Sequence, residues 1–163
     1  MPINSLAHWQ ISTSKMNLAI DIGNTRIKLG LFDGRELIEK RTWQTWSLEK
    51  IKSLTTNQNV ENVIFSNVGR KMPDEIEAYL RRQFRCIELI TQTPLPIQNA
   101  YKTPETLGKD RLAAVVGAFE MFPHQNCLVI DAGTCITYDL LRQDGVYLGG
   151  NIAPGLEMRL KAM

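Results

Sequence analysis

The 163-residue sequence lacks several features that mark particular classes of protein. No apolar run reaches the ~18 residues of a membrane-spanning helix, and the amino terminus has no apolar core of a secretory signal peptide. The net charge is only +2 and the basic residues are dispersed, so the composition offers no general attraction to nucleic acid or to an anionic membrane. We therefore expect a cytoplasmic globular protein that binds neither nucleic acid nor membrane.

Cysteine is also scarce. Cys86, Cys127 and Cys135 are odd in number and have no metal-site spacing, and two of them lie in apolar, strand-like runs. Buried free thiols in a reducing cytoplasm are the expected state. The sequence further lacks a Walker A motif and the glycine-rich loop of protein kinases, so any phosphate must be bound by another kind of loop.

A segment near the amino terminus combines two strand patterns with a polar turn. Residues 18–22 are apolar except for Asp21, and residues 26–31 alternate between polar or small and apolar. The turn between them, Gly23-Asn24-Thr25, exposes backbone N–H groups that suit phosphate. We expect Gly23 to adopt a backbone conformation that a β-carbon resists, and Asp21 to hold a metal through water. Taken alone, the segment is equally consistent with an ordinary β-turn.

The elements that follow predict a layered α/β domain. After a turn at Asp33-Gly34, the patterns indicate a strand, a helix capped by Ser47, a buried strand, a helix with Pro73 at its first position and a short strand. The expected ranges are, in order, 36–43, 48–54, 60–68, 73–84 and 86–90. The order β-β-β-α-β-α-β is typical of α/β layered domains.

A long helical pattern starts at Pro104 and runs to Phe122, after an irregular stretch at residues 91–103. Residues 112–119 are almost entirely apolar, so we expect this helix to be buried between layers. Gly108-Lys109-Asp110-Arg111 precedes the apolar half, and these charges are costly to bury unless they are paired or open to a cleft. A salt bridge on the helix surface is the alternative interpretation.

The chain then repeats its opening pattern at an offset of 110 residues. Leu18-Ala19-Ile20-Asp21-x-Gly23 corresponds to Leu128-Val129-Ile130-Asp131-x-Gly133, and Asp144-Gly145 echoes Asp33-Gly34. Thr25 matches Thr134 when one residue is dropped from the turn. Two phosphate-binding hairpins from duplicated domains, facing each other across a cleft, would clamp the phosphates of one nucleotide. The first repeat has about 110 residues and the second about 32, so we expect the second domain to be incomplete.

Four motifs, in order, resemble the type III pantothenate kinases of the actin, hexokinase and Hsp70 superfamily. They are Asp21-Ile22-Gly23-Asn24-Thr25, Gly108-Lys109-Asp110-Arg111, Asp131-Ala132-Gly133-Thr134 and Gly149-Gly150-Asn151-Ile152-Ala153-Pro154-Gly155. The resemblance implies an α/β fold of duplicated actin-like (ribonuclease H-like) domains, the second incomplete. We accordingly expect a first domain at residues 17–103, and the connecting helix and first part of the second domain at 104–163. Residues 1–15 are polar and aperiodic and Met16 stands just before the first strand, so we expect at residues 1–16 either a disordered extension or a start codon assigned too far upstream.

The resemblance implies a kinase that phosphorylates pantothenate to 4'-phosphopantothenate with ATP, the first step of coenzyme A biosynthesis. It also implies Mg²⁺ and a monovalent cation (K⁺ or NH₄⁺) as cofactors, and a homodimer. Asp110 would be the catalytic base on the pantothenate hydroxyl. Asp21 would lie near Mg²⁺, and Asp131 would ligate K⁺. The residues that would bind ATP are Asp21, Ile22, Gly23, Asn24, Thr25, Arg26, Ile27, Lys28 and Thr134. Those that would bind pantothenate are Tyr101, Gly108, Lys109, Asp110 and Arg111.

The chemistry of these side chains agrees with the implied roles. Phosphoryl transfer depends mainly on positioning and charge neutralisation, and a carboxylate at Asp110 accepts the proton of a primary alcohol. Arg111 is able to pair the pantothenate carboxylate through two hydrogen bonds. Lys109 departs from the pattern, because the family has a small residue there, and we expect its side chain to point to solvent.

Two alternatives stay open. One is another small-molecule kinase or phosphatase of the same superfamily. The other is a non-catalytic regulatory homologue or inactive fragment, since the family runs substantially longer than this chain. The presence of Asp21, Asp110 and Asp131 argues against a chain without catalytic groups.

Overall fold

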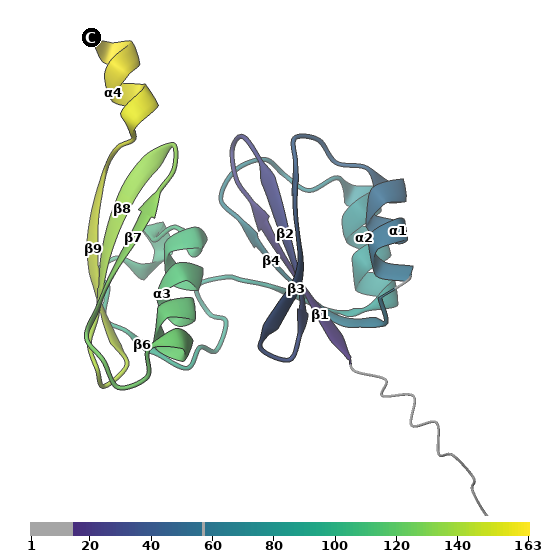
Figure 1. Cartoon of the computed structure of the whole chain (residues 1–163), viewed down its shortest axis with the longest axis horizontal. Coiled ribbons are helices and arrows are strands. Elements are labelled where there is room, and N and C mark those ends of the chain that lie inside the picture. Colours follow the sequence, from purple (N-terminus) through teal and green to yellow (C-terminus); the bar gives the residue numbers. More distant parts are fainter. Residues whose placement is uncertain (1–14, 57) are drawn as a thin grey trace, which may run out of the picture. The chain divides into compact units, whose positions relative to one another are not determined.

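The computed structural model describes residues 15–56 and 58–163 (Figure 1). Of the expected extension at residues 1–16, residues 1–14 lie outside this range, whereas Met16 begins a strand. The described chain divides into two compact units. The first comprises residues 15–20, 26–56, 58–64 and 72–87, and the second comprises residues 21–25, 65–71 and 88–163.

A five-stranded sheet forms the centre of the first half of the chain, in the order β3-β2-β1-β4-β5. The strands are β1 (Met16–Ile22), β2 (Ile27–Asp33), β3 (Glu36–Trp43), β4 (Val60–Asn67) and β5 (Arg85–Glu88). Strands β2 and β3 pair antiparallel from Ile27↔Trp43 to Asp33↔Glu36. Strands β1 and β4 run parallel, because Met16 N–H donates to Asn59 at one end and Val68 N–H donates to Ile22 at the other. Their carboxyl ends therefore meet at one edge.

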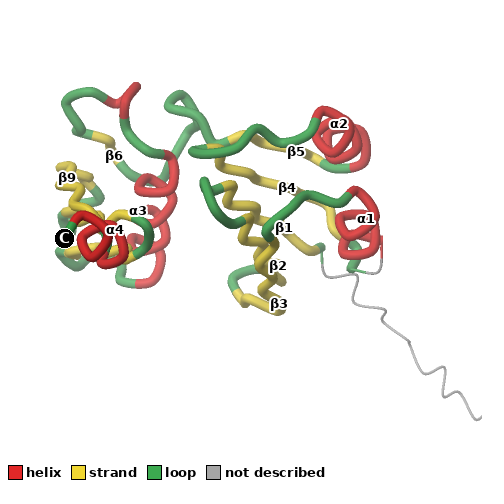
Figure 2. Tube along the Cα trace, turned by 90° about the horizontal axis from the view of Figure 1, so that it is seen from above, coloured by secondary structure: helices red, strands yellow, loops and turns green. Residues whose placement is uncertain are grey.

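Two helices, α1 (Leu48–Thr56) and α2 (Asp74–Gln83), cover one face of this sheet (Figure 2). Ser47 caps α1 as predicted, since its Oγ accepts the Lys50 N–H at 3.3 Å. Pro73 precedes α2 as its N-cap and is not the first helical residue. Apolar side chains of alternate strand positions and of both helices are buried together in this half of the chain: Leu18, Ile20, Ile22, Ile27, Leu29, Leu31, Ile51, Leu54, Ile76 and Leu80.

The second sheet has the strand order β6-β9-β8-β7. Strands β7 (Cys127–Ala132), β8 (Cys135–Leu141) and β9 (Val146–Pro154) form an antiparallel meander. The two-residue strand β6 (Gln98–Asn99) pairs parallel to β9. It lies within the stretch that was expected to be irregular. Two residues are too few to produce a periodic pattern, so the strand is defined only by its pairing.

Helix α3 (Lys109–Met121) packs against β7 and β8, and it starts later than predicted. Pro104 opens a separate 3₁₀ turn, Pro104–Thr106, and the extended backbone at Leu107 and Gly108 ends it before α3 begins. The expected burial of the whole apolar segment is wrong, because Ala113 and Gly117 are exposed. One face of α3 contributes to a core of Ile97, Leu107, Leu112, Val115, Leu141 and Tyr147.

The helix α4 (Leu156–Ala162) follows β9. None of the helices in the described part of the chain is long and apolar enough to cross a membrane.

Candidate functional site

The first polar turn follows β1, at the edge where the parallel strands β1 and β4 end. Ile22 is fully buried and anchors the strand, whereas Asn24 and Thr25 are exposed. The Ser66 hydroxyl, from the end of β4, donates to Asp21 Oδ1 at 3.0 Å. Because Ser66 is itself buried, this bond fixes the orientation of the Asp21 carboxylate at the mouth of the turn.

The loop that follows β4 lies directly against this turn. A β-carbon on Gly69 would come within 2.5 Å of the Gly23 carbonyl carbon and 2.6 Å of the Asn24 nitrogen, so only glycine fits there without movement. The Arg70 guanidinium donates to the Thr25 carbonyl at 3.2 Å. Gly23 does not have a positive φ; among the described residues the glycines that do are Gly34, Gly145 and Gly149. Gly69 is the glycine whose close approach supports this turn.

The second polar turn, between β7 and β8, is supported in a similar way. The Gly133 N–H donates to the Cys135 carbonyl at 2.9 Å, and the Gly155 N–H donates to the Thr134 carbonyl at 3.0 Å. A β-carbon on Gly155 would lie 2.5 Å from the Gly133 oxygen. Asp131 and Thr134 are exposed. A glycine from a later segment therefore packs closely against the backbone of each polar turn, Gly69 against the first and Gly155 against the second.

The amino terminus of α3 presents Asp110 beside a glycine. Gly108 is the N-cap, and a β-carbon there would overlap the Asp110 Oδ1 atom. That oxygen accepts the Arg111 backbone N–H at 2.9 Å, and the bond makes no use of Oδ2. Asp110 is half-buried. The first turn of α3 therefore orients one oxygen of the carboxylate.

Arg111 forms a buried ion pair rather than a surface salt bridge. Its Nε lies 3.1 Å from each Asp139 oxygen and its Nη2 lies 2.6 Å from Oδ1. Arg111 is 8% exposed and Asp139 is 1% exposed. Hydrogen bonding to Asp139 raises the pKa of Arg111, although desolvation acts in the opposite direction. The pair spans from the first turn of α3 to the middle of β8.

Two tyrosines complete this cluster. The Tyr147 hydroxyl donates to Asp139 Oδ1 at 2.6 Å. Burial raises the pKa of Tyr147, and the bond to Asp139 raises it further. The Tyr101 ring stacks on the Tyr147 ring with centroids 6.2 Å apart, and the Arg111 Cζ lies 5.4 Å from the Tyr101 centroid. Gly149, with a φ of +101°, leaves the space for Tyr101, because a β-carbon there would lie 2.7 Å from its ring.

Lys109 does not point to solvent as expected. Its Nζ donates to the Thr91 hydroxyl at 2.7 Å and to the Leu107 carbonyl at 3.0 Å. The long side chain therefore ties the first residue of α3 to the segment that follows β5.

The predicted residues fall into three groups. Tyr101, Arg111 and Gly149 lie in one cluster, and Asp110 joins it through the Arg111 backbone. Asp21 and Asp131 lie near the carboxyl ends of β1 and β7, each just before its own polar turn. Cys86, Cys127 and Cys135 are free thiols, as expected, and are half-buried.

Sequence reasoning missed Ser66, Gly69, Asp139 and Tyr147. The signal for Asp139 was its place in an alternating strand, on the same face as the buried Leu141. A carboxylate at such a position requires a partner inside the core.

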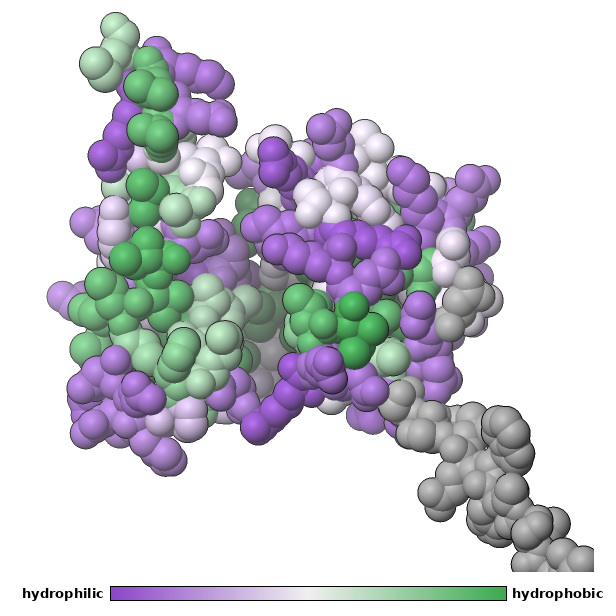
Figure 3. Space-filling view, in the orientation of Figure 1, coloured by the Kyte–Doolittle hydropathy of each residue, from purple (hydrophilic) through white to green (hydrophobic). Residues whose placement is uncertain are grey.

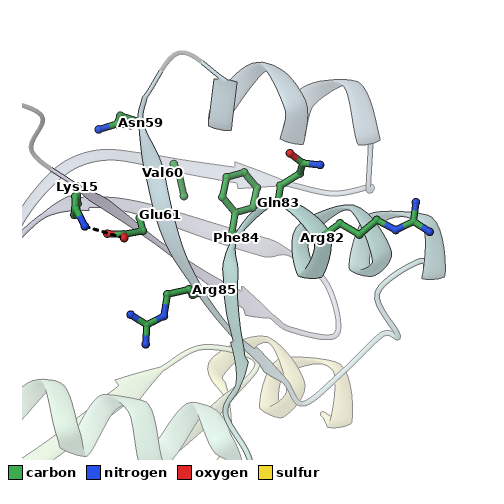
Figure 4. Close-up of a pocket in the computed structure, with 8 residues that line it drawn as sticks. All are labelled: Lys15, Asn59, Val60, Glu61, Arg82, Gln83, Phe84 and Arg85. Carbon is green, nitrogen blue, oxygen red and sulfur yellow. Dashed lines mark hydrogen bonds and ion pairs between the residues drawn. The ribbon is translucent and has the colours of Figure 1, made fainter.

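A shallow hollow lies elsewhere, at the beginnings of β4 and β5 and the end of α2 (Figure 4). Within it, Lys15 Nζ pairs with Glu61 Oε1 at 2.9 Å. The hollow is near the start of β1, the end opposite to Asp21, and it contains none of the residues predicted to bind a ligand. The lining residues are Lys15, Asn59, Val60, Glu61, Arg82, Gln83, Phe84 and Arg85.

Comparison with known proteins gives a consistent result. The family model for type III pantothenate kinases matches residues 17–163. Proteins with this name from Phocaeicola vulgatus and Bacteroides fragilis are 48% and 45% identical to the chain, each over 91% of it. The chain spans 61% of the length of each of these two relatives.

Among solved structures, a Ppx/GppA phosphatase from Aquifex aeolicus superposes with a TM-score of 0.51 at 16% identity. The match covers 91% of this chain and 55% of that one. At such low identity the likeness shows the fold alone. The predicted α/β fold class is confirmed, because helices accompany each of the two sheets.

Proposed function

We propose that this chain, which belongs to the type III pantothenate kinase family, belongs to an ATP-dependent kinase. The kinase phosphorylates pantothenate to 4'-phosphopantothenate, the first step of coenzyme A biosynthesis. The observation that carries this proposal is the family match over residues 17–163, which includes all four motifs. The glycine-backed turns at Asp21 and Asp131 and the carboxylate at the start of α3 support it.

Asp110 is the proposed general base. Its Oδ1 is fixed by the Arg111 N–H, so Oδ2 is the oxygen offered to the pantothenate hydroxyl. Removal of that proton makes the alcohol oxygen the nucleophile on the terminal phosphorus of ATP. Such a positioned base contributes about 10²–10⁴ in rate. Gly108 and the Arg111 N–H lie next to this carboxylate, and Tyr101, Lys109 and the Arg111 side chain are the other proposed members of the pantothenate site.

The first polar turn is the proposed site of the ATP phosphates. Asn24, Thr25, Arg26 and Lys28 are exposed, and Gly23 is half-buried. Short polar side chains and N–H groups at such a turn bind phosphate oxygens, and basic groups neutralise their charge. Thr134, in the exposed turn of the second repeat, is the proposed second contact to ATP.

The side chains present fit the two cations that the family implies. Mg²⁺ in phosphotransfer sites takes one or two carboxylates and completes its shell with water and phosphate oxygens, and Asp21, oriented by Ser66, offers one carboxylate. Asp131 offers a second carboxylate beside the carbonyls of its turn, which suits K⁺ or NH₄⁺. When bound, the cations would neutralise charge on the phosphates. Among the described residues, no group of three or more His, Cys, Asp or Glu side chains is arranged to hold a metal.

We also expect the kinase to be a homodimer and to work in the cytoplasm, where the three free thiols would stay reduced. Both are inferences from the family and the cysteine content.

The test is pantothenate-dependent release of ADP by the complete product of the reading frame that encodes this chain, with and without K⁺. Asp110→Asn should abolish turnover while the circular dichroism spectrum stays unchanged. Asp144→Asn is the matched control, since Asp144 is an exposed acid whose partner is the exposed Arg142. Near-normal turnover by Asp110→Asn would refute the base assignment. Transfer to other alcohols but not to pantothenate would support a different small-molecule kinase.

A further inference from the structure

The Arg111–Asp139 pair lies in a place where a salt bridge adds little stability. Both side chains and Tyr147 are at least nine-tenths buried, within the core formed by α3, β8 and β9. Removing two charges from water is costly, and apolar side chains of similar volume often serve stability as well or better. The geometry of the pair therefore calls for a role other than holding the core together.

The bond pattern leaves one side of the guanidinium available. Asp139 accepts from Nε and from one Nη2 hydrogen. An arginine side chain has five N–H donors in a planar fork, so both Nη1 hydrogens and the other Nη2 hydrogen point away from that carboxylate. The pair is neutral as a whole. It therefore presents directed hydrogen-bond donors rather than an unbalanced positive charge.

The same carboxylate is held from a second side. The Tyr147 hydroxyl donates to Asp139 Oδ1, the oxygen that also accepts from Arg111 Nη2. Tyr147 is completely buried, and its ring stacks against the ring of Tyr101. Gly149 allows Tyr101 to sit this close to β9. The position of the Tyr101 ring and that of the guanidinium thus depend on one buried assembly.

The assembly also reaches the proposed base. Arg111 donates its backbone N–H to Asp110 while its side chain is anchored to Asp139 on β8. A shift of Arg111 would therefore move both the donors at the acceptor site and the carboxylate that takes the proton.

We propose that Asp139, supported by Tyr147, is a positioning residue that aims the N–H groups of Arg111 not bonded to Asp139, together with the ring of Tyr101, at the alcohol substrate. This inference rests on the proposed function, because it treats Arg111 and Tyr101 as parts of the pantothenate site. It changes the role of Arg111 from an unpaired cation that captures a carboxylate to an oriented donor in a neutral pair.

The experiment compares steady-state kinetics of Asp139→Asn, Tyr147→Phe and the control Asp144→Asn in the complete reading-frame product. Asp139→Asn should raise the KM for pantothenate about tenfold or more, because a bond between charged groups is lost. The KM for ATP should stay within about twofold, since only the acceptor side is disturbed. Tyr147→Phe should raise the KM for pantothenate by about threefold, and Asp144→Asn should leave all constants unchanged.

The outcomes separate the two proposals. An active wild-type enzyme whose Asp139→Asn and Tyr147→Phe variants melt earlier but keep the KM for pantothenate would overturn the positioning role alone. A wild-type protein that does not phosphorylate pantothenate would refute the proposed function and the positioning role together. If Asp139→Asn does not fold, Tyr147→Phe decides the question, because it removes one hydroxyl and preserves the ring stack.

Discussion

The two repeats share a sequence pattern but bury opposite faces of their sheets. In the first, Leu18 and Ile20 are 0% and 2% exposed beneath α1 and α2. The corresponding Leu128 and Ile130 are 58% and 55% exposed. In the second repeat α3 packs on the alternate face, which carries Val129. A repeated strand pattern therefore determines which residues share a face, whereas the neighbouring helices determine which face is buried.

The exposed face of the second sheet is apolar. Hydrophobic side chains gather over β7 to β9 and continue onto α4 (Figure 3). Leu140 is 49% exposed, although its counterpart in the first hairpin, Leu31, is 1% exposed. Scattered apolar residues are ordinary on protein surfaces, but a contiguous patch of this kind is typical of a surface that contacts other protein.

The turns differ much less than the sheets. Both are exposed, and both are backed by a glycine that a β-carbon would drive into the turn backbone, Gly69 in one case and Gly155 in the other. The two turns are alike although the packing around them differs, and this is expected of elements that bind a ligand.

The largest expected effect tests whether Asp21 and Asp131, the acids beside the two polar turns, have equivalent roles. Asp21→Asn should lower kcat/KM for phosphoryl transfer by about a thousandfold, because the proposed magnesium site loses its charged ligand. Asp131→Asn should lower it by about tenfold at saturating K⁺ and raise the K⁺ concentration needed for half-maximal rate. The measurement is ADP release across a K⁺ series, with Asp144→Asn as the control. Equal losses, with no change in K⁺ dependence, would contradict the assignment of different cations to the two turns.

A second pair of variants tests the difference in burial. Leu18→Ala should lower the free energy of unfolding by about 3 kcal/mol, since it leaves a cavity beneath two helices. Leu128→Ala, at the matching position, should change it by less than about 0.5 kcal/mol. Urea unfolding gives the totals, and amide hydrogen exchange in β1 and β7 assigns the loss to a strand. Similar losses at both positions would mean that Leu128 is covered in solution.

Most of the local structure could be predicted because it depends on local chemistry. The third strand, the Ser47 cap and the two Asp-Gly turns follow from periodicity and turn residues. The start of α3 could not, because Pro104 is compatible with either a 3₁₀ turn or an α-helix and only the backbone at Leu107 separates them. The short strand β6 depends on its partner β9, which lies far along the chain.

The candidate site was predictable in part for the same reason. Glycine-rich turns and the acid after Lys109 are visible as motifs. The partners of Arg111 and Lys109 are not, since Asp139 is 28 residues away from one and Thr91 is 18 residues away from the other. The cost of burying a charged residue can be recognised from the sequence, but the sequence does not say which distant group offsets that cost.

The smallest expected effect concerns a feature found in the second repeat alone. Asp139 aligns with Gly30 of the first hairpin, so the bond from Tyr147 has no counterpart there. Burial raises the pKa of Tyr147 above its ordinary value of 10.0. The contribution of this tyrosine to stability is therefore complete below pH 10 and falls as the pH rises towards the folded-state pKa, because the unfolded chain ionises first. Between pH 10 and 11 the difference in unfolding free energy between wild type and Tyr147→Phe should shrink by about 1 kcal/mol. Urea unfolding at closely spaced pH values measures this difference, with Asp144→Asn as the reference variant. Parallel curves for wild type and Tyr147→Phe from pH 9 to 11 would show that the hydroxyl reaches water, and the proposed support of Asp139 would then lose its basis.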